Sequence, residues 1–314
     1  MIAGRAFANG IWMVVRAPIL LAGVLVITIG TAVPFGLVLN SRLQAALDEQ
    51  QPISRGSGDI DPEWWLEFRE HARGLEATFT PTVIGFAAPL DNLSSLLDAT
   101  PRPLALAGPV ALSALAWAFL WGALIHRFSQ GRAIRFGEFL SAGWRYLPRL
   151  LAISVIIGIV NLLLYFTVHA ALFGPVFQAL SGLVATERSA FAIRVALYLL
   201  FGAVVLPVSL VADYARIHLV TGCVTTVGGS LASGQRFVRR HLASVVSLAI
   251  FVGLLFATLL VAYGAIDTFG GTRVGGWRGI AIGQAYIVAR LGLRLTFTAA
   301  EVRLFQLLAA RSFP

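Results

Sequence analysis

Arginine pairs at helical spacing are the residues of this sequence best suited to chemistry. Of the arginine pairs that stand four residues apart, three lie beside or inside apolar runs: Arg145 and Arg149, Arg236 and Arg240, and Arg290 and Arg294. On a helix this spacing places both guanidinium groups on one face, where they can hold a phosphate or a carboxylate bidentately. The pairs therefore point to an anionic partner rather than to covalent catalysis.

The first two pairs belong to a repeated segment. Residues 137–152 recur at 228–243 without a gap, so that Gly143, Arg145 and Arg149 match Gly234, Arg236 and Arg240. A third copy at the N-terminus places Gly10 and Arg16 at the positions of Gly143 and Arg149. A basic amphipathic segment at a membrane surface gains about 1 kcal/mol per arginine from anionic lipid. These arginines are candidate headgroup contacts, or they only anchor the topology, as in any multi-span protein.

The third pair lies inside an apolar run. Counted from Gly279, Arg290 falls about 16 Å into a hydrocarbon core about 30 Å thick, and Arg294 lies one turn deeper. Arginine at this depth costs at least ~2.5 kcal/mol, so it needs a partner or a wet cavity. Asp213 and Glu301 are the candidate ion-pair partners. Two interpretations stay open: a buried anion or headgroup site, or a structural ion-pair network that holds the spans in register.

Other residue types exclude most enzyme classes. The chain has no lysine, which rules out a Walker-A phosphate loop and Schiff-base catalysis. Its one cysteine, Cys223, permits neither an internal disulfide nor a CxxC pair, and the five histidines form no HExxH motif. We expect no catalytic residue, no cofactor and no metal, and thus no enzyme.

Composition predicts a membrane protein. Hydrophobic residues make up 58% of the chain and charged residues only 12%, with a mean hydropathy of +0.82. Six apolar runs are long enough to cross a bilayer as helices, which needs about 20 residues each. They lie near 18–39, 103–125, 150–172, 192–213, 243–264 and 279–300. The net charge of +9 comes from arginines beside these runs, so we expect no nucleic-acid partner.

The charge distribution predicts the orientation. Arginine-rich connections follow the second and fourth runs, whereas residues 41–102 hold ten of the fifteen acidic residues. Since arginine-rich loops stay in the cytoplasm, both termini are expected inside and 41–102 outside. In that outer segment, Asp61 and Pro62 indicate a helix start, and 84–98 is helical in pattern. The segment either packs on the bundle as a loop or forms a lid over a ligand.

The repeats predict the architecture. Each copy consists of a basic interfacial segment, a span going out and a span coming back, so the copies are parallel. The expected fold is an all-α membrane domain of six transmembrane helices in three parallel hairpin repeats, N-in and C-in. The hairpin units are 1–127 (including 41–102), 128–216 and 217–314.

Each repeat combines a basic interfacial segment with a hairpin, and the fourth span ends with Asp213-Tyr-Ala-Arg216. This pattern resembles a group of bacterial six-helix membrane proteins of unassigned function. It is also similar to the membrane domain that precedes the catalytic barrel of some glycerophosphodiester phosphodiesterases. That barrel is absent here, so the resemblance carries no catalytic residues with it.

These observations favour a non-enzymatic protein of the bacterial inner membrane. We expect a lipid-interacting scaffold, or an accessory subunit of a larger membrane complex, with 41–102 in the periplasm. Its partners would be membrane phospholipids, and further membrane subunits or a second copy of the chain. The alternative is a small transporter or channel for an anionic solute or lipid.

Overall fold

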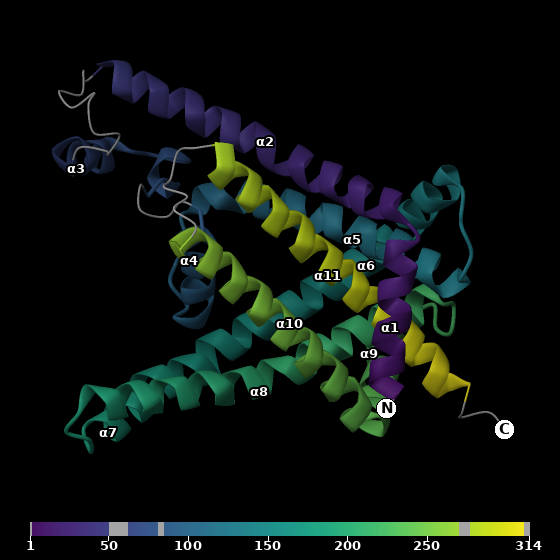
Figure 1. Cartoon of the computed structure of the whole chain (residues 1–314). Helices are drawn as coiled ribbons and strands as arrows, with labels where there is room; N and C mark the ends of the chain where they lie inside the picture. Colours follow the sequence, from purple (N-terminus) through teal and green to yellow (C-terminus); the bar gives the residue numbers. More distant parts are fainter. Residues whose placement is uncertain (1, 50–61, 81–84, 270–276, 311–314) are drawn as a thin grey trace. The chain divides into compact units, whose positions relative to one another are not determined.

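The computed structural model describes residues 2–49, 62–80, 85–269 and 277–310. Within these ranges the chain is helical throughout and contains no strand (Figure 1). Six of the described helical stretches are long and apolar enough to cross a membrane, and each contains one of the expected apolar runs almost completely. The all-α class and the six spans are thereby confirmed, and the chain is a multi-pass membrane protein.

Eleven α-helices make up most of the described chain. Their bounds are α1 Ile2–Val15, α2 Pro18–Glu49, α3 Pro62–His71, α4 Ala87–Leu97, α5 Ala107–Gln130, α6 Phe136–Leu164, α7 Phe177–Ser181, α8 Glu187–Val220, α9 Val227–Arg240, α10 Leu242–Phe269 and α11 Trp277–Ala309. Short 3₁₀ turns, η1 Glu76–Thr78 and η2 Leu104–Leu106, precede α4 and α5. Two π-helical turns, η3 Tyr165–His169 and η4 Leu172–Val176, continue α6 towards α7.

The three basic segments differ in how they join the span that follows. The first and third are separate helices, α1 and α9, whereas the second forms the start of the continuous helix α6. After α1 the chain breaks before Pro18, which lacks an N–H and suits a new first turn. In α6, Pro148 does not interrupt the helix, and Leu150 just beyond it is fully buried.

The acidic segment between the first two spans is helical where it is described. Helix α3 begins at Pro62 and α4 covers most of the second expected helix, while Asp61 and Ile84 lie outside the described residues. The Trp65 ring packs on Phe68 and Phe79, each 5.9 Å away between ring centres. Whether this segment is a packing loop or a ligand lid stays open.

The described helices group into two compact units. The first unit comprises Met1–Pro18, Trp117–Ala257 and Gly292–Pro314, and the second comprises Ile19–Ala116 and Thr258–Leu291. The first unit therefore contains all three basic segments and the C-terminal halves of the second and sixth spans. The expected hairpin boundaries at 127 and 216 stay predictions.

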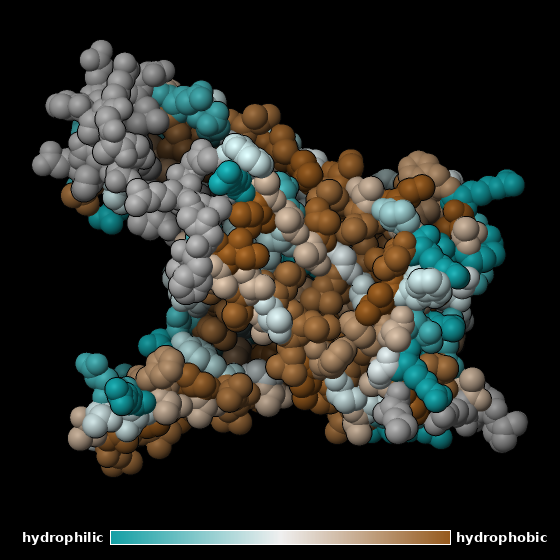
Figure 2. All heavy atoms as spheres, in the orientation of Figure 1, coloured by the Kyte–Doolittle hydropathy of each residue, from teal (hydrophilic) through white to brown (hydrophobic). Residues whose placement is uncertain are grey.

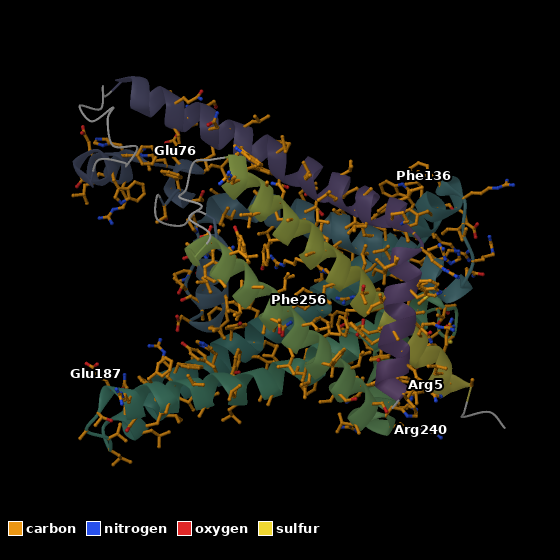
Figure 3. The ribbon with its side chains drawn as sticks, in the orientation of Figure 1. Arg5, Glu76, Phe136, Glu187, Arg240 and Phe256 are labelled. Atoms are coloured by element: carbon orange, nitrogen blue, oxygen red, sulfur yellow. The ribbon has the colours of Figure 1, made fainter. Side chains whose placement is uncertain are left out.

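The first unit is polar at its ends and apolar between them. Figure 3 labels Arg240, where α9 ends, and Glu187, where α8 begins, and the two lie at opposite ends of the unit. Between them the surface is brown in Figure 2, and side chains such as Phe166 and Leu199 are 72% and 71% exposed. So much exposed apolar surface on helices of this length is compatible with lipid and not with water.

Candidate functional site

Each basic segment is seated on a neighbouring span through its glycine. A Cβ atom at Gly10 of α1 would lie 2.8 Å from the carbonyl oxygen of Thr296 and 2.9 Å from the amide nitrogen of Ala300, both in α11. A Cβ atom at Gly234 of α9 would lie 2.7 Å from the carbonyl oxygen of Val211 in α8. Only glycine permits helices to approach this closely, because any Cβ would overlap the partner backbone.

The second copy makes a related contact. A Cβ atom at Gly143 of α6 would overlap the ring of Phe119 in α5. The three glycines thus dock α1 on α11, α6 on α5 and α9 on α8. In sequence order, each basic segment packs on the span that precedes it, and the first packs on the last.

The interfacial arginines point away from the docked faces. Residues two and six positions after each glycine lie well away from it around the helix, since each residue turns about 100°. The candidate lipid contacts Arg16, Arg145, Arg149, Arg236 and Arg240 are all exposed. The Arg16 guanidinium lies 4.2 Å from the centre of the Trp12 ring, and Arg236 donates to the Ser233 hydroxyl at 3.1 Å. The docked helices therefore present these charges at the surface.

The second, fourth and sixth spans meet at a partly buried cluster of charged and aromatic side chains. Arg216 of α8 donates to Asp213 at 2.6 Å, and its guanidinium carbon lies 3.8 Å from the centre of the Trp121 ring in α5. The guanidinium carbon of Arg294 in α11 lies 3.4 Å from the centre of the Trp117 ring. Trp117 and Trp121 are one turn apart on α5, so one face of that helix receives a cation from each of the other two spans.

Glu301 completes this charged cluster. It is only 4% exposed and lies within electrostatic range of Asp213 and Arg216. Asp213 in turn interacts electrostatically with Arg294 as well as with Arg216. Two arginines face two carboxylates, so the formal charges cancel. A neutral cluster of this kind tolerates burial far better than a single charge does.

Two buried oxygens of this region have no hydrogen-bond partner among the described residues. They are Oε1 of Glu301 and the hydroxyl of Tyr214, which is fully buried beside Asp213 in α8. A buried carboxylate oxygen without a donor is costly and rare in folded proteins. The cluster is therefore built for charge balance more than for complete hydrogen bonding.

The structure separates the two candidate arginines of the sixth span. Arg294 belongs to the first unit with Asp213 and Glu301, and it interacts electrostatically with Asp213. Arg290 belongs to the second unit, where its side chain is exposed. The ion-pair network and the anion site at Arg294 both stay predictions.

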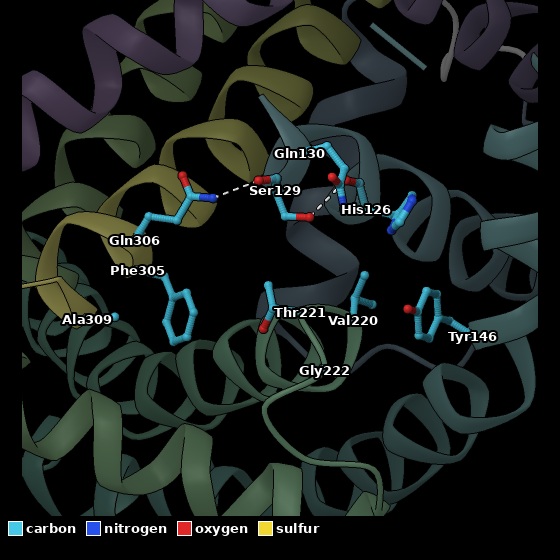
Figure 4. A pocket seen from close by; sticks show the side chains of 10 residues that line it. All are labelled: His126, Ser129, Gln130, Tyr146, Val220, Thr221, Gly222, Phe305, Gln306 and Ala309. Carbon is cyan, nitrogen blue, oxygen red and sulfur yellow. Dashed lines mark hydrogen bonds between the residues drawn. The ribbon is translucent and has the colours of Figure 1, made fainter. Parts of the chain in front are cut away.

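A pocket of about 510 Å³ opens where the same three spans end (Figure 4). It is lined by His126, Ser129 and Gln130 of α5, Tyr146 of α6, Val220, Thr221 and Gly222 at the end of α8, and Phe305, Gln306 and Ala309 of α11. The Gln306 amide donates to the Ser129 carbonyl at 2.9 Å and ties α11 to α5 across one wall. This volume falls in the usual range for small-molecule sites.

Sequence reasoning missed the pocket and half of the charged cluster. In the sequence Arg216 marks only the end of a span, and nothing there predicts a role for Trp117 and Trp121. Their spacing of four residues was a visible signal, because it puts two aromatic faces on one side of α5. Nothing in the local sequence around His126 or Gln306 indicates a cavity.

No group of three metal-binding side chains converges among the described residues. The expectation that the chain binds no metal stays a prediction. No protein-family model, curated protein or solved structure matches the chain.

Proposed function

We propose that this chain is a non-enzymatic, lipid-interacting scaffold of the bacterial inner membrane. In this proposal three parallel hairpins are arranged about a pseudo-threefold axis, with both termini and the arginine-rich loops in the cytoplasm. The observation that carries it is the seating of the basic segments. Each is docked through a glycine while its arginines stay exposed, which presents cations at a fixed level on the bundle.

The order of the glycine contacts supports the repeat architecture. Segments two and three pack on spans two and four, and segment one packs on span six, which closes a cycle of three. Such a cycle is what parallel repeats around one axis would produce. The charged cluster supports the same arrangement, because the second, fourth and sixth spans each contribute side chains to it.

A scaffold is favoured over a transporter by the charge of the centre. A transport site for an anion would need excess positive charge, whereas Arg216 and Arg294 are balanced by Asp213 and Glu301. Transport would instead be supported if the unaltered chain carried an anion across the membrane of proteoliposomes and the variant Arg290→Ala did not. Native mass spectrometry of the purified protein would also show whether other subunits or a second copy of the chain are bound to it.

The decisive experiment measures anionic lipid held by the purified protein. Native mass spectrometry would compare the unaltered chain with the double variant Arg149→Gln and Arg240→Gln in the presence of phosphatidylglycerol. We expect its affinity for that lipid to fall by an amount corresponding to about 1 kcal/mol for each arginine. The lysine pair Arg149→Lys and Arg240→Lys should retain most of the binding if charge matters more than bidentate geometry.

A matched control removes two arginines from the acidic segment instead. Arg69 and Arg73 lie in and beside α3, outside the basic segments, so Arg69→Gln with Arg73→Gln should leave phosphatidylglycerol retention unchanged. Equal retention by both double variants and the unaltered chain would reject the lipid-scaffold proposal.

A further inference from the structure

Two polar side chains of α11 are exposed within its membrane-spanning length. Gln284 and Arg290 belong to the second unit, and neither forms a hydrogen bond, an ion pair or a ring contact with any described residue. Arg294, one turn beyond Arg290, is different, because it contacts Trp117 and interacts with Asp213. Arg290 is therefore a charge in an apolar span without a partner in the described part of the chain.

The depth of Arg290 decides what kind of partner can reach it. At 1.5 Å per residue it lies about 18 Å along α11 from Arg278 and about 20 Å from Arg303, the arginines near the two ends of the helix. In a hydrocarbon core about 30 Å thick this is the middle of the membrane. Long side chains reach the headgroups only from near a helix end. A lipid phosphate is therefore a poor partner, whereas a side chain of a neighbouring helix can lie at the same depth.

These two polar residues belong to an exposed seam along α11. The seam consists of four exposed residues that follow one another at intervals of four, three and three: Ile280, Gln284, Ile287 and Arg290. Such intervals keep side chains along one side of a helix and are those by which two helices pack at a shallow angle. Amide side chains such as that of Gln284 form hydrogen bonds across helix contacts in membranes. The seam is therefore suited to a second transmembrane helix.

A second copy of this chain does not supply the missing negative charge. Away from the helix ends, the described spans carry two carboxylates, Asp213 and Glu301. Both already interact with Arg216, and Asp213 interacts with Arg294 as well. In a two-fold pair with both copies in the same orientation, Arg290 would also meet its own equivalent, which brings like charges together. Charge complementarity therefore points to a different protein.

We propose that this seam binds a transmembrane helix of another protein, one that carries a carboxylate at the depth of Arg290. The Arg290 guanidinium pairs with this carboxylate, and Ile280 and Ile287 pack against apolar side chains of the partner. Pairing removes the cost of an isolated charge in lipid. The inference goes beyond the proposed lipid interaction and uses none of the arginines on which that interaction depends.

The test measures energy transfer between the full-length protein and a synthetic transmembrane helix in phosphatidylcholine vesicles. The protein carries the donor fluorophore on its single cysteine, Cys223, which is exposed. The probe is a peptide of about 20 leucine and alanine residues with one central glutamate and an acceptor fluorophore at one end. We expect it to bind about tenfold more tightly than a matched peptide with a central glutamine. Equal affinities for the two peptides, or no binding of the glutamate peptide, would overturn the proposal.

Variants of the protein place the binding on the seam. Arg290→Gln should abolish the preference for the glutamate peptide, whereas Arg278→Gln removes an exposed charge near the end of the same helix and should retain it. Ile287→Trp should weaken binding of the glutamate peptide, and Ile250→Trp, at an exposed position of α10, should not. If Arg290→Gln and Arg278→Gln, both folded by thermal melting, show the same preference, the seam is not the site.

Native mass spectrometry distinguishes two other occupants of the seam. If a lipid phosphate lies at Arg290, retention of phosphatidylglycerol should fall in Arg290→Gln, and if a second copy lies there, this variant should lose a dimer that the unaltered chain forms. Either result overturns the proposal. Its failure is separable from failure of the scaffold proposal, because the latter is measured by phosphatidylglycerol retention and depends on Arg149 and Arg240.

Discussion

The guanidinium carbon of Arg294 lies 3.4 Å from the centre of the Trp117 ring, which joins the sixth span to the second. The same arginine is 5.6 Å from the centre of Trp121 and interacts with Asp213 of the fourth span. One cation thus connects helices that are far apart in the sequence. Its cost in a membrane is offset by two aromatic faces and a carboxylate.

Replacing this cation should destabilise the protein. Arg294→Met leaves Asp213 with one cation fewer and Trp117 without its partner, so we expect a loss of about 1–3 kcal/mol. Arg290→Met, one turn away on the same helix, removes an exposed charge and should be neutral or stabilising. Thermal melting in detergent measures both, and equal losses for the two variants would contradict the role given to Arg294.

The docking glycines make a second prediction. Gly234→Ala would bring a Cβ within 2.8 Å of the Ala215 amide nitrogen, so α9 must shift and stability should fall by about 1–3 kcal/mol. Gly228→Ala, in the same helix, meets no atom within 4 Å and should be neutral or stabilising by about 0.4–1 kcal/mol. Denaturation curves of the two variants test this contrast, and a neutral Gly234→Ala would show that α9 is not held closely on α8.

His241, between α9 and α10, leads to a prediction about pH dependence. Partial burial, and secondarily the charge of Arg240, lower the pKa of His241 below its ordinary value near 6.5. Because the unfolded chain takes up this proton more readily, the stabilising contribution is complete above pH 6.5 and decreases as the pH falls below that value. The melting temperature should therefore decrease on acidification through this range, and less steeply in His241→Gln.

A control separates His241 from the other titrating groups. Arg240→Gln removes one cause of the lowered pKa of His241 and should reduce the acid-dependent loss of stability without abolishing it. An identical acid dependence in His241→Gln and the unaltered chain would exclude this residue as a source.

The orientation is testable with the single native cysteine. Cys223 is exposed between α8 and α9, which the proposed topology places in the cytoplasm. A membrane-impermeant maleimide should label it in inverted membrane vesicles and not in intact spheroplasts. In a Cys223→Ser background, Thr100→Cys, exposed after α4, should show the opposite pattern. The reverse result at both positions would invert the proposed orientation.

The number and position of the spans could be predicted from the sequence because hydropathy is a local property. A run of about 20 apolar residues becomes a helix in lipid whatever its neighbours are, since its backbone must be satisfied internally. The start of α3 at Pro62 follows from equally local signals.

The sites depended on which helices meet, and only the tertiary structure decided that. Asp213, Arg294 and Glu301 were recognisable as charges in apolar runs, and Arg216 follows Asp213 by three residues in the same span, but the rings of Trp117 and Trp121 that contact the arginines come from α5. The pocket is still less local, because its lining residues come from four helices, α5, α6, α8 and α11, and from the turn after α8. Which helix ends come together is decided by packing between residues far apart in the sequence, so the residue types near any one of these ends do not predict the cavity.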